Sequence, residues 1–234
     1  MTSRLPCAVL WDMDGTLVDS EPYWMTEEHA LAQRHGGRWS HEDALDVVGL
    51  ALLDSATIIV ERSGIALTPE QVVTELVDGV GRRLAEAVPW RPGAQGLLAG
   101  LRAAGVRTAL VTMSYRSLTD ALERALPTGS FDVIVPGDEV RRGKPHPEPY
   151  LRAAQLLGLP ADDCVAIEDS EAGARSAAAA GARTVVVPHV KAVPRLPGTV
   201  QIPTLEGLTP TELLVVAQSA PRLQPPRGPV GQGR

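Results

Sequence analysis

Short apolar runs alternate with helical segments along most of the chain, and this alternation restricts the possible folds more than any other sequence feature. The apolar runs are 6–11, 106–111, 132–135, 164–167 and 183–187. Their length and continuous hydrophobicity are typical of strands buried on both faces, as in a parallel sheet. Helical segments lie between the later runs, and each ends at a glycine: 94–104, 147–157 and 171–180. This order predicts right-handed crossovers and a three-layer α/β core with a Rossmann-like parallel sheet.

Residues 20–87 interrupt the alternation directly after the first apolar run. They contain several helix starts and no convincing strand: Ser40 with Asp43 resembles a capping arrangement, and 68–71 supplies an N-cap threonine, a first-turn proline and a capping-box glutamine. A helical block inserted after the first strand of an α/β core indicates a cap domain. We expect hinges near 17–20 and 88–93.

The predicted division is a core of residues 1–17 and 90–216 and an all-helical cap of residues 18–89. Residues 217–234 are rich in Pro, Gly, Gln and Arg, and we expect this tail to be disordered.

The amino-acid composition restricts the possible binding partners and the cellular compartment. The 44% hydrophobic residues allow a sizeable core, and the net charge of −6 argues against an extended nucleic-acid or anionic membrane footprint. No segment approaches the ~20 apolar residues of a membrane span. Cys7 and Cys164 lie in apolar runs, as buried free thiols of a reducing cytoplasm do. We therefore expect a cytoplasmic protein, taken as a monomer, with no nucleic-acid or membrane partner.

Two carboxylates follow the first apolar run. Asp12 and Asp14 stand where the predicted strand ends, and sites in parallel sheets collect at the carboxyl ends of strands. Gly15 lets the backbone tighten, so that one carboxylate can attack while the other transfers a proton. Aspartates are also common in ordinary turns, so this pair alone supports either interpretation.

Polar side chains follow the next runs as well. Thr112 and Ser114 come after the second run, where their hydroxyls could bind phosphoryl oxygens or cap the helix that follows. Lys144 lies between a glycine and a proline; a fixed ammonium there could neutralise a transferring phosphate, although a single lysine is usually a solvated charge.

A second pair of acids, Glu168 and Asp169, ends the fourth run. Two adjacent carboxylates repel each other unless a cation holds them, and hard oxygen ligands suit Mg²⁺. Alternatively, Asp169 or Ser170 could cap the helix predicted at 171–180.

Taken together, the strand ends supply a nucleophile, metal ligands, hydroxyl donors and a cation in one sheet. If Asp12 and Asp169 hold one cation, their strands are neighbours roughly in register, and the equal spacing of Cys7 and Cys164 before these acids predicts that the two thiols lie level.

The motifs resemble those of the haloacid dehalogenase superfamily, in the family's order, from about residue 9 to residue 187. Segment 12–22 is similar to its first motif, Thr112 to its second, 143–145 to its third, and 168–170 with Gly173 to its fourth. The branch with a helical cap after the first motif is the most similar. That branch includes sugar-phosphate phosphatases, phosphoglycolate phosphatase and beta-phosphoglucomutase.

This resemblance implies a role for each candidate residue. Asp12 attacks phosphorus and becomes an aspartyl phosphate, while Asp14 protonates the leaving alcohol and later activates water. The implied Mg²⁺ ligands are Asp12, the backbone carbonyl of Asp14, and Asp169, with Glu168 supporting them. The implied phosphoryl ligands are Thr112 and Lys144, and Ser114 joins them as a hydroxyl donor. Dehalogenases lack the second acid of the first motif, so Asp14 favours an alcohol leaving group over a halide.

Three functions are compatible with these motifs. The preferred one is a phosphoric monoester hydrolase: a Mg²⁺-dependent phosphatase acting on a small phosphate monoester, most simply a sugar phosphate. The alternative is an isomerase of the beta-phosphoglucomutase kind, in which a sugar hydroxyl accepts the phosphoryl group. A catalytically silent binding protein on the same fold is disfavoured, because all five motif residues are present: Asp12, Asp14, Thr112, Lys144 and Asp169.

Overall fold

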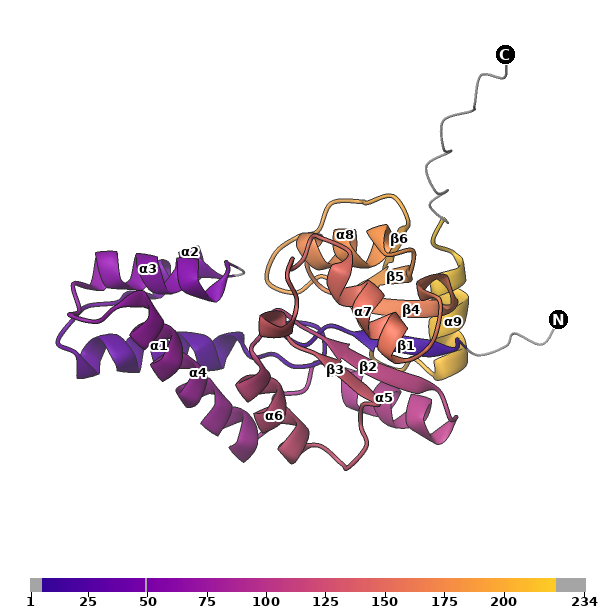
Figure 1. The fold of residues 1–234 in the computed structure, drawn as a ribbon, viewed down its shortest axis with the longest axis horizontal. Helices are drawn as coiled ribbons and strands as arrows, with labels where there is room; N and C mark the ends of the chain where they lie inside the picture. The colour runs from indigo at the N-terminus through magenta and orange to yellow at the C-terminus, as the bar shows by residue number, and fades with distance from the viewer. Residues whose placement is uncertain (1–5, 49, 222–234) are drawn as a thin grey trace, which may run out of the picture.

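The computed structural model describes residues 6–48 and 50–221, and its centre is a six-stranded parallel sheet (Figure 1). The strand order is β3-β2-β1-β4-β5-β6. The strands are β1 (Ala8–Trp11), β2 (Arg107–Val111), β3 (Val133–Val135), β4 (Cys164–Glu168), β5 (Arg183–Val186) and β6 (Thr199–Gln201). The predicted α/β class and parallel sheet are confirmed. Strand β6 was not predicted, because its three residues, none of which is fully buried, form no apolar run.

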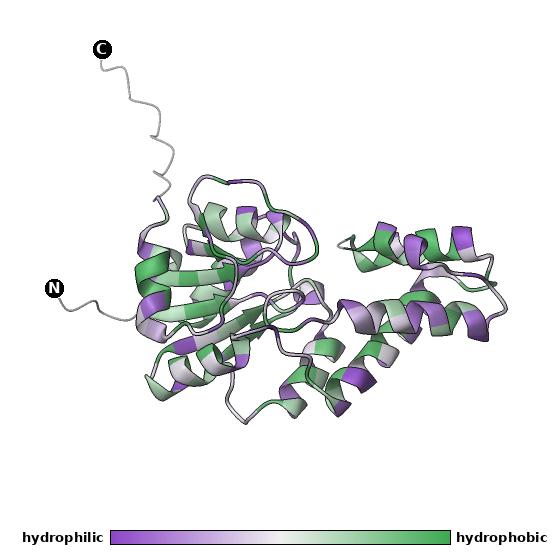
Figure 2. Cartoon of the chain, turned by 180° about the vertical axis from the view of Figure 1, so that it is seen from behind, coloured by the Kyte–Doolittle hydropathy of each residue, from purple (hydrophilic) through white to green (hydrophobic). Residues whose placement is uncertain are grey.

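Helices cover both faces of the sheet, as the apolar strands require. On one face, α7 (Glu148–Leu156) and α8 (Glu171–Ala179) pack over Ala8 and Leu10. On the other face, Val9 and Trp11 share a core with three helices: α5 (Ala94–Ala103), α6 (Arg116–Ala125) and α9 (Pro210–Gln218). Single 3₁₀ turns, Gly137–Glu139 and Ala161–Asp163, follow β3 and precede β4. Figure 2 shows apolar residues concentrated along the strands.

Helix α9 corrects one boundary of the sequence prediction. The disordered tail was predicted to begin at residue 217, but α9 continues to Gln218, and Ala217 is fully buried against the core. A capping box between Thr209 and Glu212 starts this helix. The sequence did not predict this helix, because the polar composition of the following segment placed the start of the predicted tail within its last turn. The rest of the predicted tail, residues 222–234, lies outside the described residues.

Four helices form a block to one side of the sheet (Figure 1). They are α1 (Glu21–Arg34), α2 (His41–Val47), α3 (Leu52–Ser63) and α4 (Pro69–Glu86). The capping boxes predicted at Ser40 and Thr68 are both present. None of the described residues between 21 and 87 lies in a strand. No helix in the described part of the chain is long and apolar enough to cross a membrane.

The two linkers between this block and the sheet run side by side. The Asp19 N–H donates to the carbonyl of Pro89 at 2.7 Å, and the Arg91 N–H donates to the carbonyl of Leu17 at 3.0 Å. An antiparallel bridge joins Val18 to Trp90 between these bonds. The predicted hinge segments therefore form one short paired ribbon.

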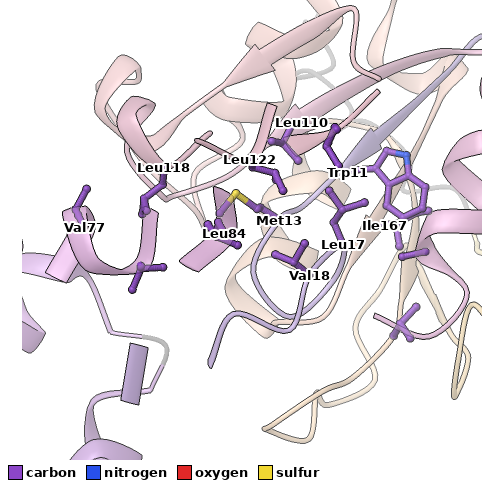
Figure 3. Packing of buried hydrophobic residues seen from close by; sticks show 14 of the residues in the cluster. Trp11, Met13, Leu17, Val18, Val77, Leu84, Leu110, Leu118, Leu122 and Ile167 are labelled. Carbon is purple, nitrogen blue, oxygen red and sulfur yellow. The ribbon is translucent and has the colours of Figure 1, made fainter. Parts of the chain in front are cut away.

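An apolar contact also connects the block to the core. Leu84 of α4 lies near Leu118 and Leu122 of α6, and Met13 completes the group beneath the strand end (Figure 3). A Cβ atom added to Gly81 of α4 would be 3.7 Å from the Ala121 methyl, so the two helices approach closely there. The block is thus attached through helix packing as well as through its linkers.

The register between β1 and β4 differs by one residue from the prediction. The equal spacing of the cysteines from the acids predicted that Cys7 and Cys164 lie level; instead, Cys164 pairs with Ala8. The strands are neighbours, as predicted, but Cys7 is only partly buried, because it precedes the strand. Burial raises the pKa of the Cys164 thiol to about 12, which keeps it unreactive.

Candidate active site

The candidate site lies where the sheet changes the direction of its connections. From β1 the chain adds β2 and β3 on one side, and it then crosses to place β4 on the other. Ligands of open α/β sheets bind at the carboxyl ends of the two strands that flank such a switch point. These strands are β1, followed by Asp12, and β4, which ends in Glu168 and is followed by Asp169. One oxygen of each acid lies within 4.8 Å of the others.

Lys144 bridges the two strand ends. Its Nζ donates to Asp12 Oδ1 at 2.6 Å, to Glu168 Oε1 at 2.6 Å and to the Val111 carbonyl at 2.9 Å. Burial alone would lower the pKa of Lys144, but Asp12 and Glu168 outweigh it and raise that pKa. The ammonium therefore stays charged, and all three of its protons are directed within the site.

A close contact with Met113 holds the loop that carries Lys144. The Lys144 N–H donates to Met113 Sδ at 3.4 Å. A Cβ atom at Gly143 would collide with the terminal Cε atom of Met113, so a larger residue would force the flexible Met113 side chain to move aside. The glycine before the lysine thus leaves room for the methionine side chain that the Lys144 N–H contacts.

Asp14 is held by hydroxyl groups. Ser20 donates to its Oδ1, while Ser114 at 2.7 Å and Thr112 at 3.4 Å donate to its Oδ2. Burial raises the pKa of Asp14, and the bonds from Ser20 and Ser114 only partly offset this. A carboxyl group with a raised pKa is suited to donate a proton.

Thr112 and Ser114 lie at the site, as predicted, and in the structure their hydroxyl groups have Asp14 as their hydrogen-bond acceptor. Both were predicted either to bind phosphoryl oxygens or to cap the following helix; in this structure both hydroxyls donate to Asp14, and the binding of phosphoryl oxygens stays a prediction. The Thr112 hydroxyl also accepts the Ser114 N–H at 2.9 Å. The contribution of Ser20 was not predicted, although its place in the first motif could have suggested it.

The three clustered carboxylates fit a divalent cation. Within the described ranges 6–48 and 50–221, Lys144 is the one cation that forms ion pairs with Asp12 and Glu168, which leaves excess negative charge. Burial, and then the charges of Asp12 and Glu168, raise the pKa of Asp169; a bound cation would reverse this shift. Gly15, with φ of +83°, lets Asp169 approach, since a Cβ atom there would be 2.1 Å from Asp169 Oδ2.

Two contacts to Glu168 were not predicted from the sequence. The hydroxyl of Tyr150 on α7 donates to Glu168 Oε1, and Gly173 on α8 leaves room for the whole carboxylate. A Cβ atom at Gly173 would lie 2.0 Å from both carboxylate oxygens. Gly173 was recognised as part of the fourth motif, but its contact with Glu168, like that of Tyr150, arises from the packing of the helices on the sheet.

Gly173→Ala is expected to destabilise the protein, although alanine normally favours a helix. Gly173 is the third residue of α8, and a methyl group there would collide with the buried Glu168 carboxylate. We expect a loss of about 1–3 kcal/mol in the free energy of unfolding, as for overpacking.

Gly96→Ala is the matched control. Gly96 is the third residue of α5, and a methyl group there meets nothing within 4 Å. It should gain roughly 0.5–1 kcal/mol. Urea denaturation of both variants gives the comparison, and equal stabilisation of the two would contradict the contact with Glu168.

The comparisons with known proteins agree with this geometry. A family model described as haloacid dehalogenase-like hydrolase matches residues 8–181. The chain belongs to this family. The match confirms the family resemblance seen in the motifs and covers both strand ends of the site. Among the relatives of this chain, Hexitol phosphatase A of Escherichia coli is 33% identical over 80% of this chain and 85% of its own.

Further relatives extend the comparison to a solved structure. Protein CbbY of Rhodobacter capsulatus is 36% identical over 77% of this chain and 85% of its own. The crystal structure of CbbY from Rhodobacter sphaeroides in complex with phosphate superposes with a TM-score of 0.77 at 26% identity, covering 87% of this chain and 96% of that one. Family membership, together with relatives named as phosphatases, supports the prediction that this chain is a phosphoric monoester hydrolase.

Proposed function

We propose that this protein is a Mg²⁺-dependent phosphatase that hydrolyses a small sugar phosphate through an aspartyl phosphate at Asp12. The observation that carries the proposal is the bridge of Lys144 Nζ between Asp12 and Glu168 at the switch point of the sheet. Asp14, a half-buried residue whose pKa is raised by desolvation, stands two residues beyond the proposed nucleophile. The similarity to a hexitol phosphatase supports a phosphorylated sugar or polyol as the substrate.

Each residue has one proposed task. An oxygen of Asp12 forms a bond to phosphorus as the bond to the leaving oxygen breaks, and Asp14 donates its proton to that oxygen. Asp14, now a carboxylate, then takes a proton from the water that cleaves the aspartyl phosphate. Lys144 orients Asp12 and neutralises phosphoryl charge. When Mg²⁺ is bound by Asp12, Asp169 and the Asp14 carbonyl, it would supply further charge neutralisation and alignment.

Thr112 and Ser114 have a proposed task in both steps. Their bonds to Asp14 hold its carboxyl group in place in this structure. When the proton of Asp14 has been transferred, these hydroxyls can stabilise the carboxylate or donate to the phosphoryl oxygens.

The helical block of residues 18–89 is proposed to act as a cap that carries substrate specificity. Its two linkers form a paired ribbon directly beside the first motif, so a small change in the ribbon would move the block over the site. The packing of α4 on α6 would limit the extent of this movement. Exclusion of water would then favour transfer to Asp12.

A panel of substrates tests the proposed activity. Hexitol phosphates, hexose phosphates, pentose phosphates, phosphoglycolate and nucleotides are each incubated with Mg²⁺, and released phosphate is measured. We expect the highest kcat/KM for a sugar or polyol phosphate. A hexose 1-phosphate with a hexose bisphosphate activator forms a separate arm. Conversion to the 6-phosphate without phosphate release would show that the protein is a mutase and not a phosphatase.

Metal removal should abolish the activity. EDTA is expected to stop turnover and Mg²⁺ to restore it, while Ca²⁺ inhibits because of its looser coordination. Asp169→Ala should weaken Mg²⁺ binding measured by calorimetry by at least about tenfold. Asp163→Ala is the control, since this exposed acid precedes β4 at the opposite end of the strand. Full turnover in EDTA would refute the metal assignment.

A further inference from the structure

Tyr150 is a polar residue in an apolar layer. It lies on α7, its exposed fraction is 0%, and it packs with Leu10, Val111 and Ala166 between the helix and the sheet. Burying a hydroxyl group in such surroundings is unfavourable unless it is hydrogen-bonded, and a phenylalanine would fill the same space without that cost. The hydroxyl donates to Glu168 Oε1. The packing therefore explains why an aromatic ring lies here, and the hydrogen bond to Glu168 explains why the ring carries a hydroxyl group.

Glu168 is held from several directions. Its Oε1 accepts from both Lys144 and Tyr150, its Oε2 accepts from Ser170 at 3.2 Å, and the absence of a side chain at Gly173 leaves room for the carboxylate. The residue is 0% exposed. Its carboxylate thus has one orientation, in which Oε1 faces the ammonium of Lys144.

Tyr150 also contacts Lys144 directly. The Nζ atom lies 5.3 Å from the centroid of the Tyr150 ring, within the range of a cation–π interaction. The same tyrosine therefore supports the ammonium with its ring and the ammonium's counter-ion with its hydroxyl. The other ion pair of this ammonium is with Asp12, the proposed nucleophile.

We propose that Tyr150 is a positioning residue, whose hydroxyl fixes Glu168 so that Lys144 stays directed at Asp12 and at a phosphoryl group held there. This inference rests on the proposed phosphatase function. Without the hydroxyl, Oε1 loses its neutral donor and competes more strongly for the ammonium. Lys144 then moves toward Glu168, away from the phosphoryl oxygens.

The test uses inorganic phosphate as the probe, in the presence of Mg²⁺. Tyr150→Phe keeps the ring and removes the hydroxyl. Because the lost bond is to a charged group, we expect phosphate binding measured by calorimetry and kcat/KM each to fall about tenfold. Thr184→Val is the matched control: it removes another fully buried hydroxyl, which lies on β5 and donates to the carbonyl of Ala182 just before that strand, away from the site. It should leave phosphate affinity unchanged.

A double-mutant cycle separates positioning from packing. If Tyr150 acts through Glu168, Tyr150→Phe should change phosphate affinity less than about twofold in a Glu168→Gln background, because no carboxylate remains to be held. Equal losses in both backgrounds, or no loss in the wild-type background, would overturn the proposal. Failure of Tyr150→Phe to fold would also overturn it, since the hydroxyl would then be needed for the fold itself.

Measurements on the wild-type protein distinguish a failure of the role proposed for Tyr150 from a failure of the proposed phosphatase function. If the wild-type chain with Mg²⁺ neither binds phosphate nor hydrolyses any monoester, the phosphatase assignment fails before any variant is compared. If the wild type binds phosphate and Tyr150→Phe behaves like Thr184→Val, only the role of Tyr150 fails.

Discussion

Asp12→Asn is expected to lower kcat by at least about a thousandfold on the best substrate. The amide has nearly the shape of the carboxylate but lacks the charge and the nucleophilic oxygen that would attack phosphorus. The substitution also removes the negative charge that pairs with the Lys144 ammonium, whose Nζ lies 2.6 Å from Asp12 Oδ1. Lys144 keeps its bonds to Glu168 and the Val111 carbonyl, so we expect the variant to fold.

The control for this variant is Asp163→Asn. It makes the same chemical change in an exposed residue at the other end of the sheet. Both variants should keep the wild-type circular dichroism spectrum, and the control should keep wild-type turnover. A folded Asp12→Asn protein with more than about a tenth of the wild-type kcat would exclude Asp12 as the nucleophile.

Asp14→Asn should separate proton transfer from metal binding. Its backbone carbonyl, the proposed metal ligand, is unchanged, so Mg²⁺ affinity measured by calorimetry should stay within about twofold of wild type. Turnover of alkyl phosphates should fall by roughly a hundred- to ten-thousandfold, the usual contribution of a general acid. The amide oxygen can still accept the hydrogen bonds that reach one of the two carboxylate oxygens, and the amide NH2 group can donate to the hydroxyl on the other side, which limits any structural disturbance.

Aryl phosphates supply the internal control for Asp14→Asn. Their leaving groups are stable without protonation, so the first step should be affected much less. Single-turnover release of the alcohol or phenol is measured by quenched flow for both substrate classes. Equal losses on the two classes would show that Asp14 is not the acid.

The strands of the core and the residues of the site were largely predictable because both depend on local patterns. Continuous apolar runs marked β1, β2, β3, β4 and β5, and polar residues at their ends marked the site. Parallel strands bring their carboxyl ends to one edge, so residues as distant as Asp12 and Lys144 meet without any local signal between them. The capping boxes at Ser40 and Thr68 were predictable because a capping box is also a local sequence pattern.

The remaining features depend on contacts between distant segments. The pairing of Ala8 with Cys164 placed Asp12 level with Glu168, one residue from the predicted register, and spacing along the chain does not determine this. The hydroxyl of Tyr150 reaches Glu168 at the end of β4 only because α7 packs on the neighbouring strands β2 and β3. Helix α9 was overlooked because its capping box lies close to a segment of polar composition. Packing between layers, rather than local pattern, decides such features.

Trapping of the phosphorylated protein tests the central claim most directly. The Asp14→Asn variant is mixed with an activated aryl phosphate and Mg²⁺ and quenched with acid, and its peptides are analysed by mass spectrometry. Since this variant should complete the first step and stall in the second, we expect a stoichiometric burst of phenol. The mass of one phosphoryl group should appear on the peptide that contains Asp12, and borohydride should reduce that residue. Phenol release without any phosphorylated peptide, or a phosphoryl group on another residue, would contradict an aspartyl phosphate at Asp12.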